Sequence, residues 1–140
     1  MGFFSKLKIG YTQAADIGKA RLALPECIKT VKEVRSRRIT HSRCLADPRL
    51  IGTPAQDAIL RMIKSDEILE LTHMAAAASC QVLANAMHAS PKDEDLVAAA
   101  VEATNLSIDE ANTARERSDE DFAVLKHELK QLNVTLRHGV

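Results

Sequence analysis

The most regular hydrophobic pattern lies in the last third of the chain, where residues that suit a helix core recur at alternating spacings of four and three. This alternation is typical of the seam of a coiled-coil helix. No Pro or Gly interrupts residues 92–138, so we predict one long helix there. Small and polar seam members near Arg115 predict a bend or a polar layer at that point. The seam consists of Val97, Val101, Thr104, Ile108, Ala111, Arg115, Ser118, Phe122, Leu125, Leu129, Leu132 and Leu136.

A second helix is predicted over residues 54–89, where apolar residues form one stripe and further apolar residues widen it into a second apolar face. Short runs of alanine near residues 75–78 and 98–100 remove side-chain bulk, which allows neighbouring helices to approach closely. We expect Leu83 and Ile108 in the core. The stripe consists of Ile59, Met62 or Ile63, Leu69, Ala76, Cys80, Leu83 and Met87, and it is widened by Leu60, Leu71, Met74 and Val82.

Capping residues mark where these two helices begin. Thr53, Pro54 and Gln56 supply a capping hydroxyl, a proline suited to the first turn and an amide three residues after the cap. The sequence at Ser90, Pro91 and Asp93 repeats this arrangement, so we predict a second helix start there. Because the connection between the helices is short, they should form an antiparallel hairpin.

The N-terminal third predicts helices near residues 12–24 and 26–45, split or joined as one bent helix at Pro25. Few aromatic residues and few glycines argue against a small all-β fold. We therefore predict an all-α fold: a single domain over residues 1–140, built as an elongated antiparallel bundle of three long helices with a coiled-coil-like last helix. Residues 1–11 should be a flexible or docking segment.

Charge is balanced overall, with 19 basic and 19 acidic residues, but it is unevenly distributed. Residues 19–49 hold nine Lys and Arg against three acids, whereas residues 93–121 hold ten acids against two Arg. The zero net charge argues against nucleic acid as a partner. We expect the basic helix, represented by Arg35, Arg37 and Arg38, to face the acidic segment; binding of an external anionic partner is the alternative. The acidic segment is represented by Glu116, Asp119, Glu120 and Asp121.

Candidate catalytic and metal-binding groups are sparse. Glu70 and His73 form a single Glu-x-x-His step, which gives the alternative of a small signalling or di-iron-like metal protein. His41 and Cys44 share a helix face, but no second pair at metal-ligand spacing accompanies them. We therefore expect no enzyme activity, no cofactor and no resident metal. The three cysteines should pack as small apolar groups, and their odd number favours a reducing cytoplasm.

Two apolar surfaces are candidate partner sites. Phe3, Phe4 and Leu7 stand beside lysines at the N-terminus and should contact the bundle, a protein partner or a membrane surface. We expect the late seam leucines to extend past the span that the shorter helices can cover, which predicts a homodimer. No stretch is long and apolar enough to predict a transmembrane span. The sequence thus predicts a non-enzymatic binding or adaptor protein that self-associates. The late seam leucines are Leu125, Leu129, Leu132 and Leu136.

Overall fold

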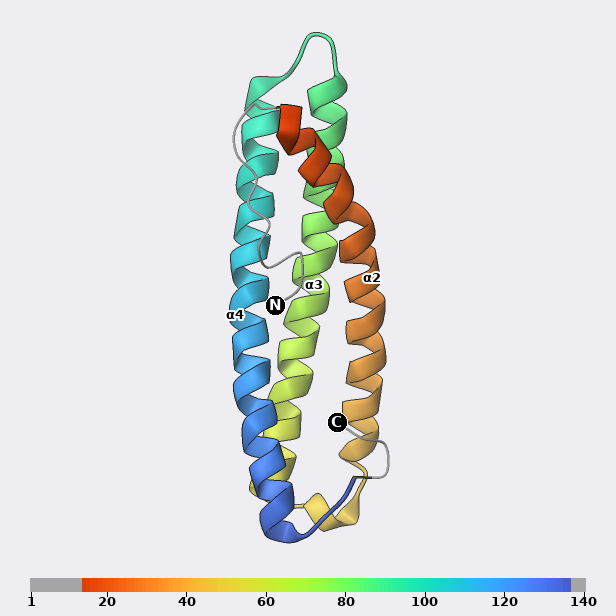
Figure 1. Cartoon of the computed structure of the whole chain (residues 1–140), viewed down its shortest axis with the longest axis vertical. Helices are drawn as coiled ribbons and strands as arrows, with labels where there is room; N and C mark the ends of the chain where they lie inside the picture. Colours follow the sequence, from red (N-terminus) through yellow and green to blue (C-terminus); the bar gives the residue numbers. More distant parts are fainter. Residues whose placement is uncertain (1–13, 137–140) are drawn as a thin grey trace.

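Three long helices lie side by side along the long axis of the molecule in a computed structural model (Figure 1). The structure describes the backbone of residues 14–136 and the side chains of residues 22–136. Helix α2 (Ala14–Cys44) leads through a 3₁₀ turn, η1 (Pro48–Leu50), into α3 (Pro54–His88), and α4 (Glu94–Leu132) follows. The backbone of α3 lies close to both α2 and α4, which do not approach each other as closely. The predicted elongated all-α bundle is confirmed.

Helix α2 is one continuous helix that contains Pro25. Of the two arrangements considered, the single bent helix is therefore the observed one. Proline lacks an amide hydrogen and its ring crowds the preceding turn, which commonly bends a helix. Figure 1 shows the N-terminal part of α2 inclined across the bundle relative to the rest of the helix.

The start of α3 follows the sequence prediction. Thr53 is the N-cap, and its Oγ1 accepts a hydrogen bond of 3.3 Å from the backbone N–H of Gln56. The side chain of Gln56 returns to accept from the backbone N–H of Gly52 at 3.1 Å. Gly52 has a φ of 72°, a left-handed conformation that glycine adopts without steric cost. Capping side chains thus satisfy two backbone donors at this end.

The start of α4 differs from the prediction. Its N-cap is Asp93, whose carboxylate accepts from the backbone N–H of Leu96 at 3.1 Å, so Ser90 and Pro91 lie in the connection. Asp and Ser are equally good N-caps, and the acidic residues that follow Asp93 stabilise the first turn through the helix dipole. Glu94 and Asp95 occupy that turn.

The last helix ends earlier than the seam suggested. Asn133 adopts a left-handed conformation with a φ of 53°, and Val134 donates a backbone hydrogen bond of 3.0 Å to Leu129. This arrangement is a common helix stop, and Asn tolerates the conformation it requires. Leu136 therefore lies beyond the helix rather than on it, and the prediction that the seam continues to this residue was wrong.

Buried apolar residues form two clusters. The upper cluster joins all three helices and contains both Leu83 and Ile108 at 0% exposure, as predicted. The lower cluster lies near η1 and contains Leu50, Ile59 and Leu125. Buried polar residues of α2 and α3 lie among these apolar residues and form a group that we call the polar layer, whereas the sequence placed a bend or polar layer on the last helix near Arg115. These residues are His41, Asp66, Glu70 and His73.

Candidate functional site

Asp66 is the centre of the polar layer between α2 and α3. Its side chain is fully buried, and its Oδ1 accepts hydrogen bonds from Nε and Nη2 of Arg37 at 2.9 and 2.7 Å. The other oxygen accepts from Nδ1 of His41 at 2.8 Å. His41 is 1% exposed, so the pair is shielded from water, whereas Arg37 reaches the surface. The guanidinium therefore neutralises a carboxylate that would be costly to bury alone.

Glu70 makes the second set of ion pairs one turn away. One carboxylate oxygen lies 2.6 Å from Nε of Arg35 and the other lies 2.6 Å from Nη1 of Arg38. The hydrogen bond from Arg35 is the main reason that the pKa of Glu70 lies below its usual value, against an opposing effect of burial. These two carboxylates make the α2–α3 contact partly electrostatic.

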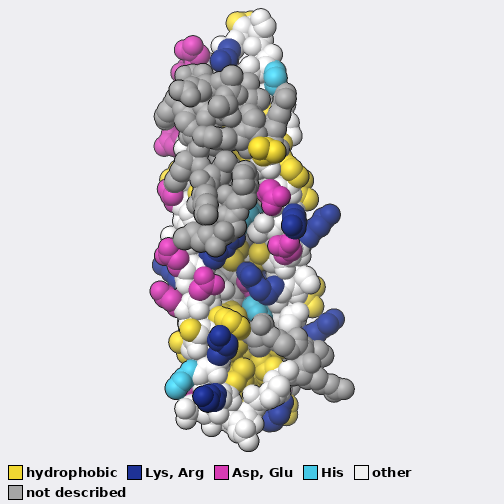
Figure 2. All heavy atoms as spheres, in the orientation of Figure 1, with side chains coloured by type: hydrophobic (Ala, Val, Ile, Leu, Met, Phe, Trp, Pro, Cys, Tyr) yellow, Lys and Arg dark blue, Asp and Glu magenta, His cyan; other side chains and the backbone are white. Residues whose placement is uncertain are grey.

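The basic helix is thus matched within the chain, but its predicted partners were wrong. Arg35, Arg37 and Arg38 pair with carboxylates of α3 rather than with the acidic segment of α4. Sequence periodicity did not identify this arrangement because the partners are 29 to 35 residues apart. Figure 2 shows acidic side chains gathered mainly on the α4 side of the upper and middle bundle, whereas basic side chains lie on the α2 side and also on the lower part of the α4 side. An external partner for the arginines stays a prediction.

Glu70 and His73 do not form the shared site that their spacing suggested. Glu70 is bound by α2 arginines, whereas Nδ1 of His73 donates to the backbone oxygen of Leu69 at 2.7 Å. His73 is fully buried, and burial is the main cause of its lowered pKa, to which the charge of Arg115 also contributes. A signalling role of His73 would need an imidazole that a partner can reach, and this side chain is fully buried. Among the described residues, no group of three or more His, Cys, Asp or Glu could hold a metal ion.

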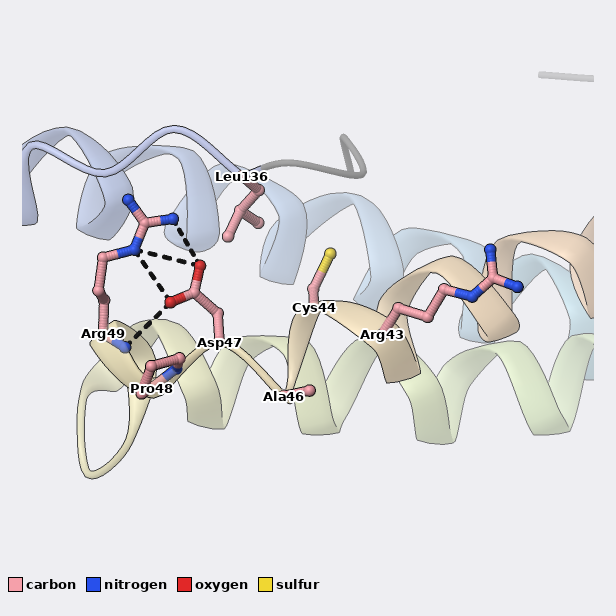
Figure 3. A pocket seen from close by; sticks show the side chains of 7 residues that line it. All are labelled: Arg43, Cys44, Ala46, Asp47, Pro48, Arg49 and Leu136. Carbon is pink, nitrogen blue, oxygen red and sulfur yellow. Dashed lines mark hydrogen bonds and ion pairs between the residues drawn. The ribbon is translucent and has the colours of Figure 1, made fainter.

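A pocket of about 400 Å³ lies beside the connection between α2 and η1 (Figure 3). Figure 3 shows the Cys44 side chain and Leu136 directed into it, with Arg49 held against Asp47 at one end. Hydrogen bonds from Arg49 lower the pKa of Asp47 to about 2. Burial raises the pKa of the Cys44 thiol, so the protonated form of this thiol is favoured and it is a poor nucleophile.

Burial also raises the pKa of the other two cysteine thiols. Cys27 and Cys80 are fully buried in the upper cluster. Burial, with a smaller effect of neighbouring Cys80 and Glu26, raises the pKa of Cys27 to about 12. None of the three cysteines forms a disulfide, and the prediction that they pack as small apolar groups is confirmed.

The late leucines proposed as a dimer surface are largely used inside the chain. Leu125 is fully buried in the lower cluster, and Leu129 and Leu136 pack against that cluster. Leu132, at 38% exposure, is the most open of these residues. The premise that the seam leaves an open apolar strip was therefore wrong, and the dimer stays a prediction. Phe3, Phe4 and Leu7 lie outside the described residues.

A further candidate surface is the solvent-exposed side of the α3–α4 hairpin, which we call the outer face. Two shallow pockets between these helices establish its lower half, because they bring Lys64 and Ile68 of α3 together with Glu110 and Arg117 of α4. Residues seven positions apart on a helix lie on nearly the same side. The upper half of the outer face can therefore be followed in steps of seven from these residues and from Thr113, which lines one of the pockets.

The upper half of the outer face is apolar. Steps of seven from Lys64 reach Leu71 and Ala78, and steps from Ile68 reach Ala75 and Val82. On α4 the same steps, taken toward the N-terminus, reach four more apolar residues. All eight are exposed, including Leu71 at 65%. An exposed apolar patch of a few hundred Å² on a protein surface is often an interaction site. We call these eight residues the apolar patch: Leu71, Ala75, Ala78, Val82, Leu96, Ala99, Ala103 and Leu106.

Sequence reasoning did not select this patch, although the second apolar face predicted for residues 54–89 pointed to it. The widening of the α3 stripe by Leu71 and Val82 was a second apolar face, and only the structure shows that this face has no cover among the described residues.

Comparisons with protein-family models, with curated proteins and with solved structures find no match to this chain. Within residues 14–136, no helix is both long and apolar enough to cross a membrane.

Proposed function

We propose that this protein is a non-enzymatic binding module that recognises a helix of a partner protein on the apolar patch. The observation that carries the proposal is the exposure of eight apolar side chains in two helical stripes. On α3 they are spaced by four, three and four residues, and on α4 by three, four and three. Such spacings keep side chains on one side of a helix, where a third helix can contact both stripes.

The dimensions of the patch fit a short helix. From Leu71 to Val82 the rise along α3 is about 17 Å at 1.5 Å per residue, which corresponds to about three helical turns. Half of the patch residues are alanines, whose small side chains let a partner backbone approach closely. A helix laid between α3 and α4 would complete a four-helix packing unit, in which each helix buries an apolar stripe against its neighbours.

A single helix suits the patch better than a second copy of the chain. With helix axes about 10 Å apart, two helices present a strip roughly 20 Å wide. Together with the length of the patch, this gives roughly 350 Å², whereas a stable dimer buries about 800 Å² on each partner. The patch is therefore too small to supply a stable dimer interface alone, and a slender partner matches its extent.

The titratable groups of the bundle interior support a non-enzymatic role. Asp66 and Glu70 are neutralised by arginines that join α2 to α3. Burial disfavours the charged forms of His73 and Cys80. These groups hold the helices together rather than facing a substrate. A cytoplasmic location, which three cysteines without a disulfide favour, remains part of the proposal.

Photo-crosslinking in the native cell tests the proposed function. A photoreactive amino acid replaces Ala78, within the apolar patch, and in a control it replaces Ile39, which is 54% exposed on α2. We expect position 78, and not position 39, to crosslink to a helical segment of another protein, identified by peptide mass spectrometry. Equal crosslinking from both positions would refute the patch as a specific site. Crosslinks from position 78 to a second copy would replace the partner helix with a homodimer.

A further inference from the structure

We infer that the helix recognised by the apolar patch is basic, an inference that rests on the proposed function and names the chemistry of the partner. The charges around the patch are almost all of one sign. Residues 65–114 contain nine Asp and Glu, one Lys and no Arg. The buried pair Asp66 and Glu70 is already matched by α2 arginines, so these two do not contribute to the outer surface.

Four of the remaining carboxylates flank the patch at the surface. Glu67 precedes Leu71 by one turn of α3, and Glu110 follows Leu106 by one turn of α4. Asp95 and Glu102 each adjoin a patch residue along α4. All four are exposed and make no ion pair with the described residues. The apolar patch is therefore bordered by uncompensated negative charge on both helices.

The lower half of the outer face carries charges of both signs, unlike the border of the patch, because Lys64 and Arg117 lie there beside Asp109 and Glu120. Lys64 and Arg117 line the pockets there, and Arg61 pairs with Asp121 at 2.8 Å. A basic helix extended into this half would meet Lys64 and Arg117 as well as carboxylates, whereas one confined to the patch is bordered by the four carboxylates named above. Each exposed ion pair contributes little, but several charges of one sign together steer an oppositely charged partner. Lysines or arginines flanking a short apolar stripe are the complement of this surface.

Two synthetic peptides of 14 residues distinguish the sign of the partner. Both carry the same Leu and Ala stripe at helical spacing, and their remaining positions are Lys in one peptide and Glu in the other. Binding to the full-length protein is measured by fluorescence anisotropy at low salt and at 0.5 M salt. We expect the Lys peptide to bind at least tenfold more tightly at low salt, with an advantage that shrinks as salt screens the charges.

Variants locate the effect on the protein. Replacing two of the four flanking acids, Glu67→Gln with Glu110→Gln, should reduce the preference for the Lys peptide severalfold. The control is Glu116→Gln, which removes an exposed charge from the same helix about 120° around from Glu110, and it should leave the preference unchanged.

The outcomes separate the two proposals. If both peptides bind equally, or the Glu peptide binds better, the inference of a basic partner is overturned while helix binding stands. If neither peptide binds, or if Leu71→Ser with Leu106→Ser leaves binding intact, helix recognition by the patch itself fails. If Glu116→Gln abolishes the preference for the Lys peptide as strongly as the paired variant does, the acidic residues that select this peptide lie elsewhere on α4.

Discussion

His41 and Asp66 form a hydrogen bond of 2.8 Å in the interior of the α2–α3 contact, where neither side chain is more than 1% exposed. Arg37 places its positive charge against the other oxygen of the same buried carboxylate, which offsets the cost of burying Asp66. A carboxylate oxygen only accepts hydrogen bonds, so Nδ1 of His41 is the donor. The three residues act as a unit, and removing one of them changes the environment of the other two.

Asp66→Ala should destabilise the bundle, because it leaves the buried His41 without its acceptor. Breaking a fully buried ion pair costs about 3–5 kcal/mol, and the partial exposure of Arg37 places the expected loss near or below the lower end of that range. The measurement is the free energy of unfolding in urea. Arg61→Ala, which removes the surface pair with Asp121, is the control and should cost about 0.2–1 kcal/mol. Equal losses would contradict a special role for the polar layer.

Leu83→Asp should unfold the protein, whereas Leu71→Asp should not. Leu83 is fully buried in the upper cluster, and an unpaired carboxylate there costs several kcal/mol out of the ~5–15 kcal/mol that stabilises a domain. Leu71 lies on the same helix but is 65% exposed, so its replacement should change stability by about 0.5 kcal/mol or less. Circular dichroism melting of both variants tests the assignment of inner and outer faces. A folded Leu83→Asp variant would show that the assignment is wrong.

The N-cap of α4 can be located by two alanine substitutions. Asp93→Ala removes the carboxylate that accepts from Leu96 and should cost about 1 kcal/mol. Ser90→Ala changes a residue outside the helix and should have an effect within about 0.5 kcal/mol. Thermal unfolding measures both. A larger loss of stability in Ser90→Ala than in Asp93→Ala would show that Ser90 is the N-cap.

Acidification should weaken the fold through His73. Its pKa is lowered in the folded state, so as pH falls the unfolded chain binds the proton first, below about pH 6.5. The sign is therefore a loss of stability on going from pH 7.5 to 5.5, and His73→Gln should reduce this loss. His127→Gln, which changes an exposed histidine of α4, serves as the control. Unfolding free energies with the same pH slope in the wild type and in His73→Gln would rule out this contribution.

The parts of the fold that could be predicted from the sequence are those that depend on local chemistry. Thr53, Pro54 and Gln56 specify a helix start within four residues, and heptad spacing assigns Ile108 to the core without reference to any other helix. Asn133 was a usable stop signal, because Asn favours the left-handed conformation that ends α4. At Ser90 and Asp93 two equivalent caps compete, and local pattern alone does not choose between them.

The candidate site was less predictable because it depends on which helix faces which. Arg37 has the same local sequence context whether its partner is Asp66 or Asp119, and only the packing of α2 on α3 decides between them. Likewise, the pattern assigns Leu125 and Leu71 to apolar faces, but it does not say that the first is covered by the chain and the second is open. Exposure is a property of the assembled bundle, and a single helix pattern does not contain it.

The ion pairs between α2 and α3 also fix the register of these helices. Apolar packing tolerates a shift along the axis, because one small hydrophobic residue can replace another in the same gap. A shift of one turn, about 5.4 Å, would break the native pairs of Arg37 with Asp66 and of Arg38 with Glu70, so each carboxylate in the interface would need a new cation. Alternative alignments of α2 therefore carry an electrostatic penalty that the native alignment avoids.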